Sequence, residues 1–213
     1  MLVDTELIVK MPPRLFAAGI ADCIAAWEGY YNLKYANLLD EVDAISLDQL
    51  RRFPKIIEDN AIKAYEAVQK QEITHEFENA VSAMSFVNGA PYSLMGCFLC
   101  HLMDELFDTI PESRKLLHGE RVGFGGLIQF VFVDNMEKFY DWLKLFQAIG
   151  LPCTLKDMGL ENMSYDEFYE YCKKDLETGI FAKMPFYKFT AKELADATFK
   201  VDKLAKEYLS KKA

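Results

Sequence analysis

Helical periodicity is the feature that most limits how this chain of 213 residues can fold. Apolar side chains recur every three or four positions along most of its length, as they do on the buried face of an α-helix. Proline and glycine interrupt the pattern at residues 12–13, 88–91 and 150–152. After Val9 no stretch alternates convincingly between apolar and polar residues as a half-buried strand does. The pattern therefore predicts an all-α, multi-helix bundle.

Caps and breaks set the expected helix bounds. The two prolines at residues 12–13 start a helix that continues over residues 14–32, because proline is favoured in a first turn. Ser46 is the expected N-cap of the next helix, since a hydroxyl can accept a backbone N–H there. The later helices are expected over residues 47–71, 74–86, 92–107, 119–133, 134–149, 164–177 and 190–211. The residues before Lys10 instead predict the end of a strand and a turn.

Composition narrows the class of protein. Hydrophobic residues make up 51% of the chain, so we expect a soluble globular protein with one helical domain over residues 1–213. A formal charge of −9 without a basic run argues against nucleic-acid binding. The apolar run at 15–31 is too short and too charged to span a membrane. Five cysteines without framework spacing and no visible secretory signal predict a cytoplasmic protein.

Two of the three histidines, His101 and His118, flank a short break at Pro111 and lie next to apolar helical sequence. A third group, Asp22, falls among small apolar residues of a predicted helix, where an unpaired carboxylate is costly to bury. Two histidines and a carboxylate match the ligands of a catalytic zinc site with one open position. The alternatives are a core histidine at His101, a surface histidine at His118 and a solvated helix side at Asp22.

Other polar residues near the histidines have two readings each. Cys97 lies four residues before His101, so it could be an alternative ligand, but with Cys100 it also fits a pair of small buried side chains. Asp104 lies three residues after His101. It could orient a metal ligand or the substrate, or it could simply be a charge at a helix end. Glu120 could orient a ligand or stabilise a helix start.

The glycine-rich sequence at residues 123–126 is not predicted to bind a dinucleotide. A dinucleotide-binding loop follows a strand and opens a helix, whereas this sequence falls within a helix. Small residues that allow close helix packing are the better explanation.

Three of these motifs, taken in order, resemble the glycerol dehydrogenase family of iron- or zinc-containing polyol dehydrogenases, which are dehydroquinate synthase-like proteins. The first is the helix at 14–25 with Asp22, the second is His101 on a helix, and the third is the His118-Gly-Glu sequence that opens the next helix. The spacing between the two histidines fits the family without a gap. The sequence at residues 184–195 also resembles the family's last helix, so the resemblance extends over residues 3–208.

The resemblance implies a fold and a function. The chain would be the C-terminal, helical, metal-binding domain of a two-domain protein, and the N-terminal nucleotide-binding domain that carries NAD is absent from the sequence. Asp22, His101 and His118 would bind zinc or another divalent metal. Asp104 and Glu120 would then contact these ligands and orient them. The expected reaction is NAD-dependent oxidation of a small vicinal polyol such as glycerol by a homo-oligomer, and the chain alone should bind metal without turnover.

The chain departs from the family at Asp104, where relatives carry a second histidine three residues after the ligating one. Two alternatives therefore stay open. One is an enzyme for glycerol phosphate or a sugar phosphate on the same scaffold, which would need a cationic pocket near Arg114, Lys115 and Arg121. The other is a helical interaction module that has lost catalysis. No catalytic residue beyond the metal ligands is predicted.

Overall fold

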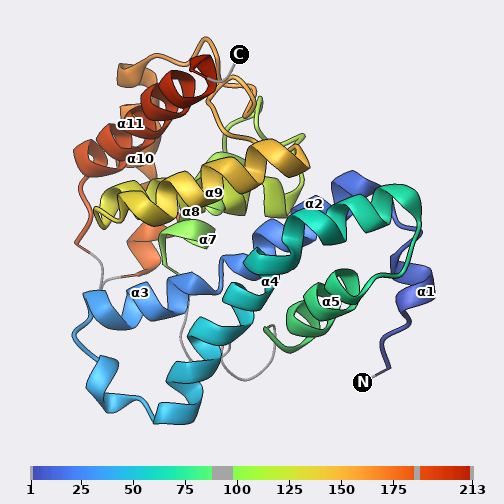
Figure 1. Ribbon diagram of the computed structural model, residues 1–213. Helices are drawn as coiled ribbons and strands as arrows, with labels where there is room; N and C mark the ends of the chain where they lie inside the picture. Colours follow the sequence, from blue (N-terminus) through green and yellow to red (C-terminus); the bar gives the residue numbers. More distant parts are fainter. Residues whose placement is uncertain (1, 88–97, 185–187, 212–213) are drawn as a thin grey trace. The chain divides into compact units, whose positions relative to one another are not determined.

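The computed structural model describes residues 2–87, 98–184 and 188–211. All regular structure within these ranges is helical (Figure 1), so the all-α prediction is confirmed. The chain divides into two compact units, Met1–Phe98 with Ala148–Leu151, and Leu99–Gln147 with Pro152–Ala213. The turn expected at residues 88–91, the start of the helix expected at residue 92, Cys97 and part of the motif at residues 184–195 lie outside the described ranges.

The first unit is built around one long helix, α4 (Ala44–Lys70), which packs against α2, α3 and α5. Figure 1 shows α5 alongside α4. Aromatic packing such as that of Phe16 on Phe77, with ring centroids 5.7 Å apart, fills the space between helices. The other elements of this unit are α1 (Thr5–Ile8), α2 (Pro13–Ile24), α3 (Trp27–Tyr35), η1 (Leu39–Glu41) and α5 (His75–Val87).

Two local predictions in this unit are wrong, the strand end before Lys10 and the N-cap at Ser46. Residues Thr5–Ile8 form a helical turn and not a strand end, because the Asp4 side chain accepts the N–H groups of Glu6 and Leu7. The N-cap of α4 is Asp43 and not Ser46, since the Asp43 carboxylate accepts the N–H groups of Ile45 and Ser46 itself. The helix start expected at residue 74 is confirmed, since the Thr74 hydroxyl accepts the Phe77 N–H just before α5 begins.

The helix predicted over residues 14–32 is also wrong, because it divides into α2 and α3 at Ala25 and Ala26. Tight bonds from the Ala26 N–H to the Cys23 carbonyl and from the Glu28 N–H to the Ala25 carbonyl form the joint. Beyond it Glu28 is fully buried, and its carboxylate accepts the Phe98 N–H at 2.9 Å. This bond satisfies a buried backbone group and offsets part of the cost of burying the carboxylate.

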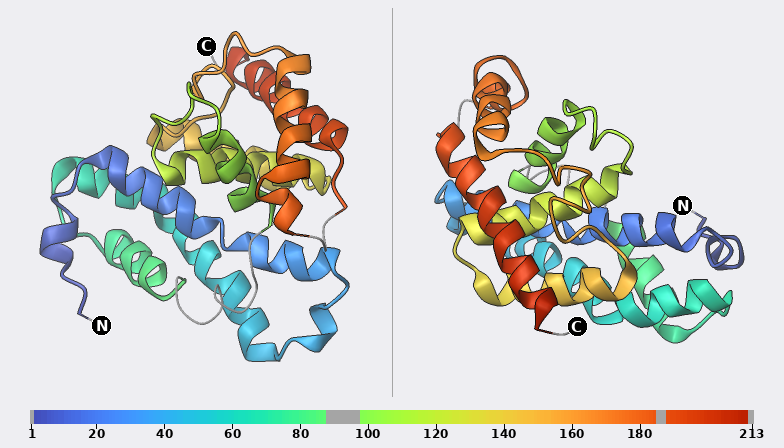
Figure 2. Two further views of the ribbon diagram at one scale, coloured as in Figure 1. Left: turned by 180° about the vertical axis from the view of Figure 1, so that it is seen from behind. Right: turned by 90° about the horizontal axis from the view of Figure 1, so that it is seen from above.

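The second unit is centred on α8 (His118–Phe132), in which every residue from Gly119 to Val131 is buried. It packs against α7 (Leu99–Asp108) and α11 (Ala191–Ser210), and Figure 2 shows these helices from two further sides. The helix starts predicted at residues 164 and 190 are confirmed, and Ser164 and Thr190 each form a capping box at the start of α10 and α11. The remaining elements are α9 (Met136–Ile149), α10 (Tyr165–Thr178) and η2 (Phe181–Lys183).

Two glycines let α8 approach its neighbours closely. A Cβ atom on Gly125 would lie 2.4 Å from the Cys100 carbonyl oxygen of α7, and one on Gly126 would lie 2.2 Å from the Trp142 ring. Both distances are below any normal contact, so only glycine fits at these two positions. The prediction of close helix packing in place of a nucleotide loop is confirmed. Cys100 is buried here, and its Sγ lies 3.4 Å from Gln129 Oε1.

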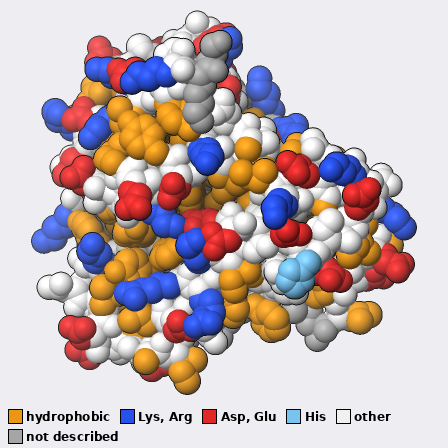
Figure 3. Space-filling view, viewed as in Figure 1, with side chains coloured by type: hydrophobic (Ala, Val, Ile, Leu, Met, Phe, Trp, Pro, Cys, Tyr) orange, Lys and Arg blue, Asp and Glu red, His pale blue; other side chains and the backbone are white. Residues whose placement is uncertain are grey.

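The surface of the described residues is charged on the face that Figure 3 presents. Acidic side chains and those of lysine and arginine are interspersed there, with apolar atoms between them. No helix in the described ranges combines the length and the apolar character that a membrane crossing requires.

Candidate metal centre

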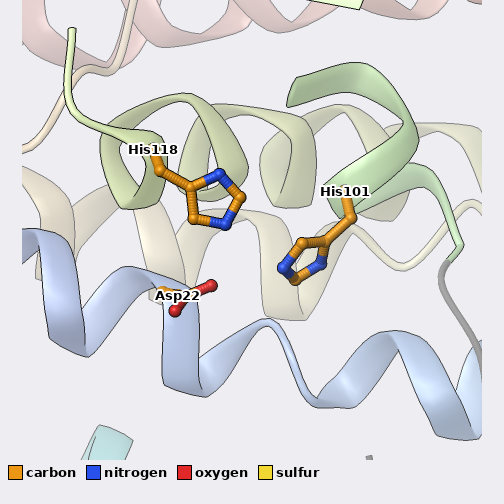
Figure 4. Close-up of side chains that lie close together, drawn as sticks. All are labelled: Asp22, His101 and His118. Atoms are coloured by element: carbon orange, nitrogen blue, oxygen red, sulfur yellow. The ribbon is translucent and has the colours of Figure 1, made fainter. Parts of the chain in front are cut away.

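Helices α7 and α8 bring His101 and His118 together within the second unit. His101 lies in the first turns of α7, and His118 is the first residue of α8 (Figure 4). Their ring centroids are 5.4 Å apart with an interplanar angle of 50°. The connection between the helices is held by Ser113, whose buried hydroxyl donates to the Phe107 carbonyl. The seventeen-residue spacing seen in the sequence therefore corresponds to a true spatial pair.

This separation fits a pair of imidazoles that share one metal ion. Two rings bound through nitrogen atoms about 2.0–2.1 Å from one tetrahedral metal have their centres about 5 Å apart. An aromatic pair could have a similar spacing, but the imidazole is the commonest metal ligand among side chains, and neither ring is fully buried. The solvent exposure of the two histidines also suits metal binding, because His101 is half-buried and the His118 side chain is 51% exposed. The pair is therefore chemically suited to a metal.

A buried acid lies directly behind His118. Asp104, on α7, is 2% exposed, and its Oδ2 lies 2.8 Å from His118 Nδ1. Its other oxygen, Oδ1, accepts from Arg121 Nε at 2.7 Å. The Arg121 guanidinium also contacts the Asp108 carboxylate at 3.2 Å and donates to the Leu116 carbonyl at 2.8 Å. Asp104 therefore contacts His118, and its role in orienting a metal ligand stays a prediction.

Glu120 stabilises the start of α8. It is 4% exposed, and its Oε2 accepts the Leu117 N–H at 2.8 Å. This bond satisfies one of the donors left open at a helix N-terminus and fixes the first turn, which carries His118. Glu120 therefore acts on the backbone next to His118.

Asp22 lies in the first unit, on α2, and Figure 4 draws its side chain. It is half-buried between two buried neighbours, Ala21 and Cys23. It also lines a cavity of about 350 Å³ formed within this unit by residues of α1, α2 and α5. Its position in an apolar helix agrees with the sequence pattern. Its role as a metal ligand stays a prediction.

Arg121 is the residue whose role the sequence did not reveal. It was considered only as a cation for a phosphate pocket, yet its side chain is 9% exposed and bonded to two acids. Two spacings could have pointed to this role, since Asp104 lies three residues after His101 and Arg121 three residues after His118. Each i, i+3 pair puts the charged residue on the same helix face as a histidine, but whether the two faces meet depends on the register of the helices. Cys97, the alternative ligand, lies outside the described residues.

Comparison with known proteins gives a consistent picture. No protein-family model matches the chain. It is 28% identical over 219 residues to a glycerol dehydrogenase of Citrobacter freundii, a match that covers 99% of this chain and 59% of that protein. It is 26% identical to glycerol dehydrogenase 1 of Schizosaccharomyces pombe, over 98% of this chain and 48% of that protein. The chain thus spans about half the length of the curated relatives it matches.

A comparison with a solved structure agrees with the comparison of sequences. The glycerol dehydrogenase of Schizosaccharomyces pombe superposes with a TM-score of 0.86 at 24% identity, covering 98% of this chain and 55% of that one. At this level of identity the structural likeness establishes the helical fold, and the sequence matches carry the relationship. The resemblance expected from Asp22, His101 and the His118-Gly-Glu motif is therefore confirmed: over nearly its whole length this chain is similar to part of proteins named glycerol dehydrogenase.

Proposed function

We propose that this chain is the metal-binding part of an NAD-dependent oxidoreductase that acts on a small vicinal polyol such as glycerol. The observation that carries the proposal is the His101–His118 pair, whose rings lie 5.4 Å apart within one unit of the fold. The similarity to proteins named glycerol dehydrogenase supports the substrate class. The nucleotide-binding half, the cytoplasmic location and a homo-oligomeric state belong to the same proposal.

In this proposal Asp22, His101 and His118 hold one zinc or other divalent ion. Each residue offers one ligand atom, a carboxylate oxygen or an imidazole nitrogen. Two nitrogens and one oxygen suit zinc and leave one coordination position open. Asp22 belongs to one unit and the histidines to the other, so the proposal requires the ion to take ligands from both units.

The chemistry follows from the ligand set. A bound divalent metal acts as a Lewis acid, which would favour deprotonation of a polyol hydroxyl and so the transfer of hydride to the nicotinamide ring. The chain's own residues keep the site in order. Asp104 holds the His118 ring, and Glu120 fixes the first turn of α8 beneath it. The exposed side of His118 leaves room for a small polar substrate.

The bonding of two of the three nearby cations, Arg121 and Arg114, supports an uncharged polyol over a phosphorylated substrate. The Arg121 guanidinium already contacts two carboxylates and a carbonyl. Arg114 donates through Nε to the Asp108 carbonyl. A phosphate site needs cations that converge on the ligand, and these two are directed at other groups of the protein.

Metal content tests the proposal directly. We expect the purified chain to bind about one zinc ion per molecule in a calorimetric titration, in line with a three-ligand site. His101→Ala and Asp22→Ala should lose most of this binding, because each removes one ligand. His75→Ala is the matched control, since His75 is exposed at the start of α5 and should leave binding unchanged. A wild-type chain that binds no metal above background would favour the non-enzymatic interaction module.

A further inference from the structure

His118 and Arg121 approach Asp104 from the same helix. His118 and Arg121 are three residues apart on α8, and both point at the buried carboxylate on α7. Asp104 has both oxygens engaged, Oδ1 at 2.7 Å from Arg121 Nε and Oδ2 at 2.8 Å from His118 Nδ1. A carboxylate bound on two sides cannot rotate without breaking one of these bonds.

Arg121 determines which partner in the contact between Asp104 and His118 carries the proton. A guanidinium has five N–H donors and no acceptor, and it stays protonated in proteins. Its bonds to Asp108 and to the Leu116 carbonyl anchor it independently of Asp104. The oxygen of Asp104 that faces His118 therefore belongs to a carboxylate and accepts a hydrogen bond. The imidazole must supply the proton, so its Nδ1 carries the hydrogen.

We infer that Asp104, clamped by Arg121, is a positioning residue that holds His118 in the Nδ1–H tautomer, with Nε2 as the nitrogen presented to a metal. The tautomer itself follows from the contacts within α7 and α8, while its use in metal binding rests on the proposed function. Histidine ligands commonly donate their second nitrogen to a carboxylate, and this bond sets the ring orientation. His118 needs such a restraint because its side chain is half-exposed.

The family resemblance leads us to expect a histidine at the position of Asp104, and a histidine there would act differently. A neutral imidazole there could donate or accept, and so would not specify the tautomer of its neighbour. A carboxylate that is held by a guanidinium can only accept, so it specifies the tautomer of the histidine beside it.

The first test uses the unmodified, metal-free chain. Nitrogen-15 NMR distinguishes a protonated from an unprotonated imidazole nitrogen, and it should be recorded at a pH where the rings are neutral. We expect His118 to show a protonated Nδ1 and an unprotonated Nε2, whether or not the chain binds metal. An Nε2–H tautomer at His118 would overturn the inference.

The second test is Asp104→Asn, which should reverse the tautomer. Because Arg121 can only donate, the carbonyl oxygen of the introduced amide must face Arg121, and the NH₂ group of that amide must face His118. Nδ1 then has to accept, and the proton moves to Nε2. Zinc affinity measured by calorimetry should fall about 10- to 100-fold, the usual effect of losing such a partner.

Asp108→Asn is the matched control for this variant. It removes a carboxylate from the same guanidinium, on the half-exposed side, without touching His118. The tautomer and the zinc affinity should both stay as in the wild type. If Asp104→Asn does not fold, the tautomer of the wild-type chain still decides the inference.

The outcomes separate this inference from the proposed function. A wild-type chain with the Nδ1–H tautomer and no zinc binding supports the inference about Asp104 and contradicts the proposed metal site. Zinc binding that is unchanged in a folded Asp104→Asn variant supports the metal site and overturns the positioning role. A fall in affinity together with a reversed tautomer supports both.

Discussion

At the scale of single residues, Cys153 and Cys172 have thiols whose pKa is raised to about 12. Burial is the main cause for each, and the nearby carboxylates of Asp157 and Asp175 add to it. The thiolate is the reactive form of cysteine. We therefore expect both residues to resist iodoacetamide at pH 8 in the native chain and to react after unfolding, as followed by peptide mass spectrometry.

The same two thiols give a pH dependence with a definite sign. Their folded pKa lies above the ordinary thiol value of 9.0, so at high pH the folded state keeps protons that the unfolded state has lost. The stability they contribute is complete below about pH 9 and is lost as the pH rises toward 12. Native labelling at pH 8 as fast as that of the unfolded chain would contradict this account.

Individual site residues differ in how far the sequence could identify them. His101 and His118 stood out because histidine is rare in this chain and because both adjoin apolar helices. The bonds that join Asp104 to His118 and Arg121 could not be read from the sequence. They depend on the axial register of α7 against α8, which is set by side-chain packing between the two helices.

At the scale of helices, local signals predicted most starts and missed one break. Ser164 and Thr190 cap their helices with side chains that bond within the first turn, so four residues of sequence are enough to find them. The break between α2 and α3 falls at Ala25 and Ala26, which are good helix formers. It is associated with the burial of Glu28 against the distant Phe98, and a long-range bond leaves no local signal.

The contact between α7 and α8 depends on Gly125. In Gly125→Ala the new methyl group would meet the Cys100 carbonyl at 2.4 Å, and backbone atoms cannot move aside as a side chain can. We expect the free energy of unfolding to fall by about 1–3 kcal/mol, the usual cost of overpacking. Urea unfolding monitored by circular dichroism measures it.

Gly19→Ala is the control for this substitution. It also adds a methyl group to a glycine inside a helix, but the nearest atom is the flexible end of Met84 at 3.2 Å. Alanine favours helix over glycine by about 0.5–1 kcal/mol, so this variant should be unchanged or slightly more stable. Equal destabilisation of both variants would show that the close approach of α7 and α8 is not the cause.

At the scale of the whole molecule, the proposed metal has a consequence for stability. A ligand that binds only the folded state stabilises it by mass action, by about 2.7 kcal/mol at a concentration 100 times its Kd. If His101 and His118 alone held the ion, metal binding would stabilise only the second unit. If Asp22 completes the site, the ion belongs to both units, and both should gain.

The two tryptophans allow each unit to be followed separately. The chain contains only Trp27 and Trp142, one in each unit. Trp142→Phe leaves a reporter in the first unit, and Trp27→Phe leaves one in the second. With excess zinc, fluorescence-detected thermal unfolding should shift to higher temperature in both variants, because the proposed ion would take ligands from both units.

The Asp22→Asn variant tests whether the metal stabilises the first unit through Asp22. The substitution keeps the size of the side chain and weakens its bond to a cation, so the zinc-induced shift of the Trp27 signal should disappear while that of Trp142 becomes smaller. A Trp27 shift that persists in Asp22→Asn would mean that the units are coupled by other contacts. No Trp27 shift with Asp22 intact would exclude Asp22 as a ligand and leave the histidine pair as the whole metal site on this chain.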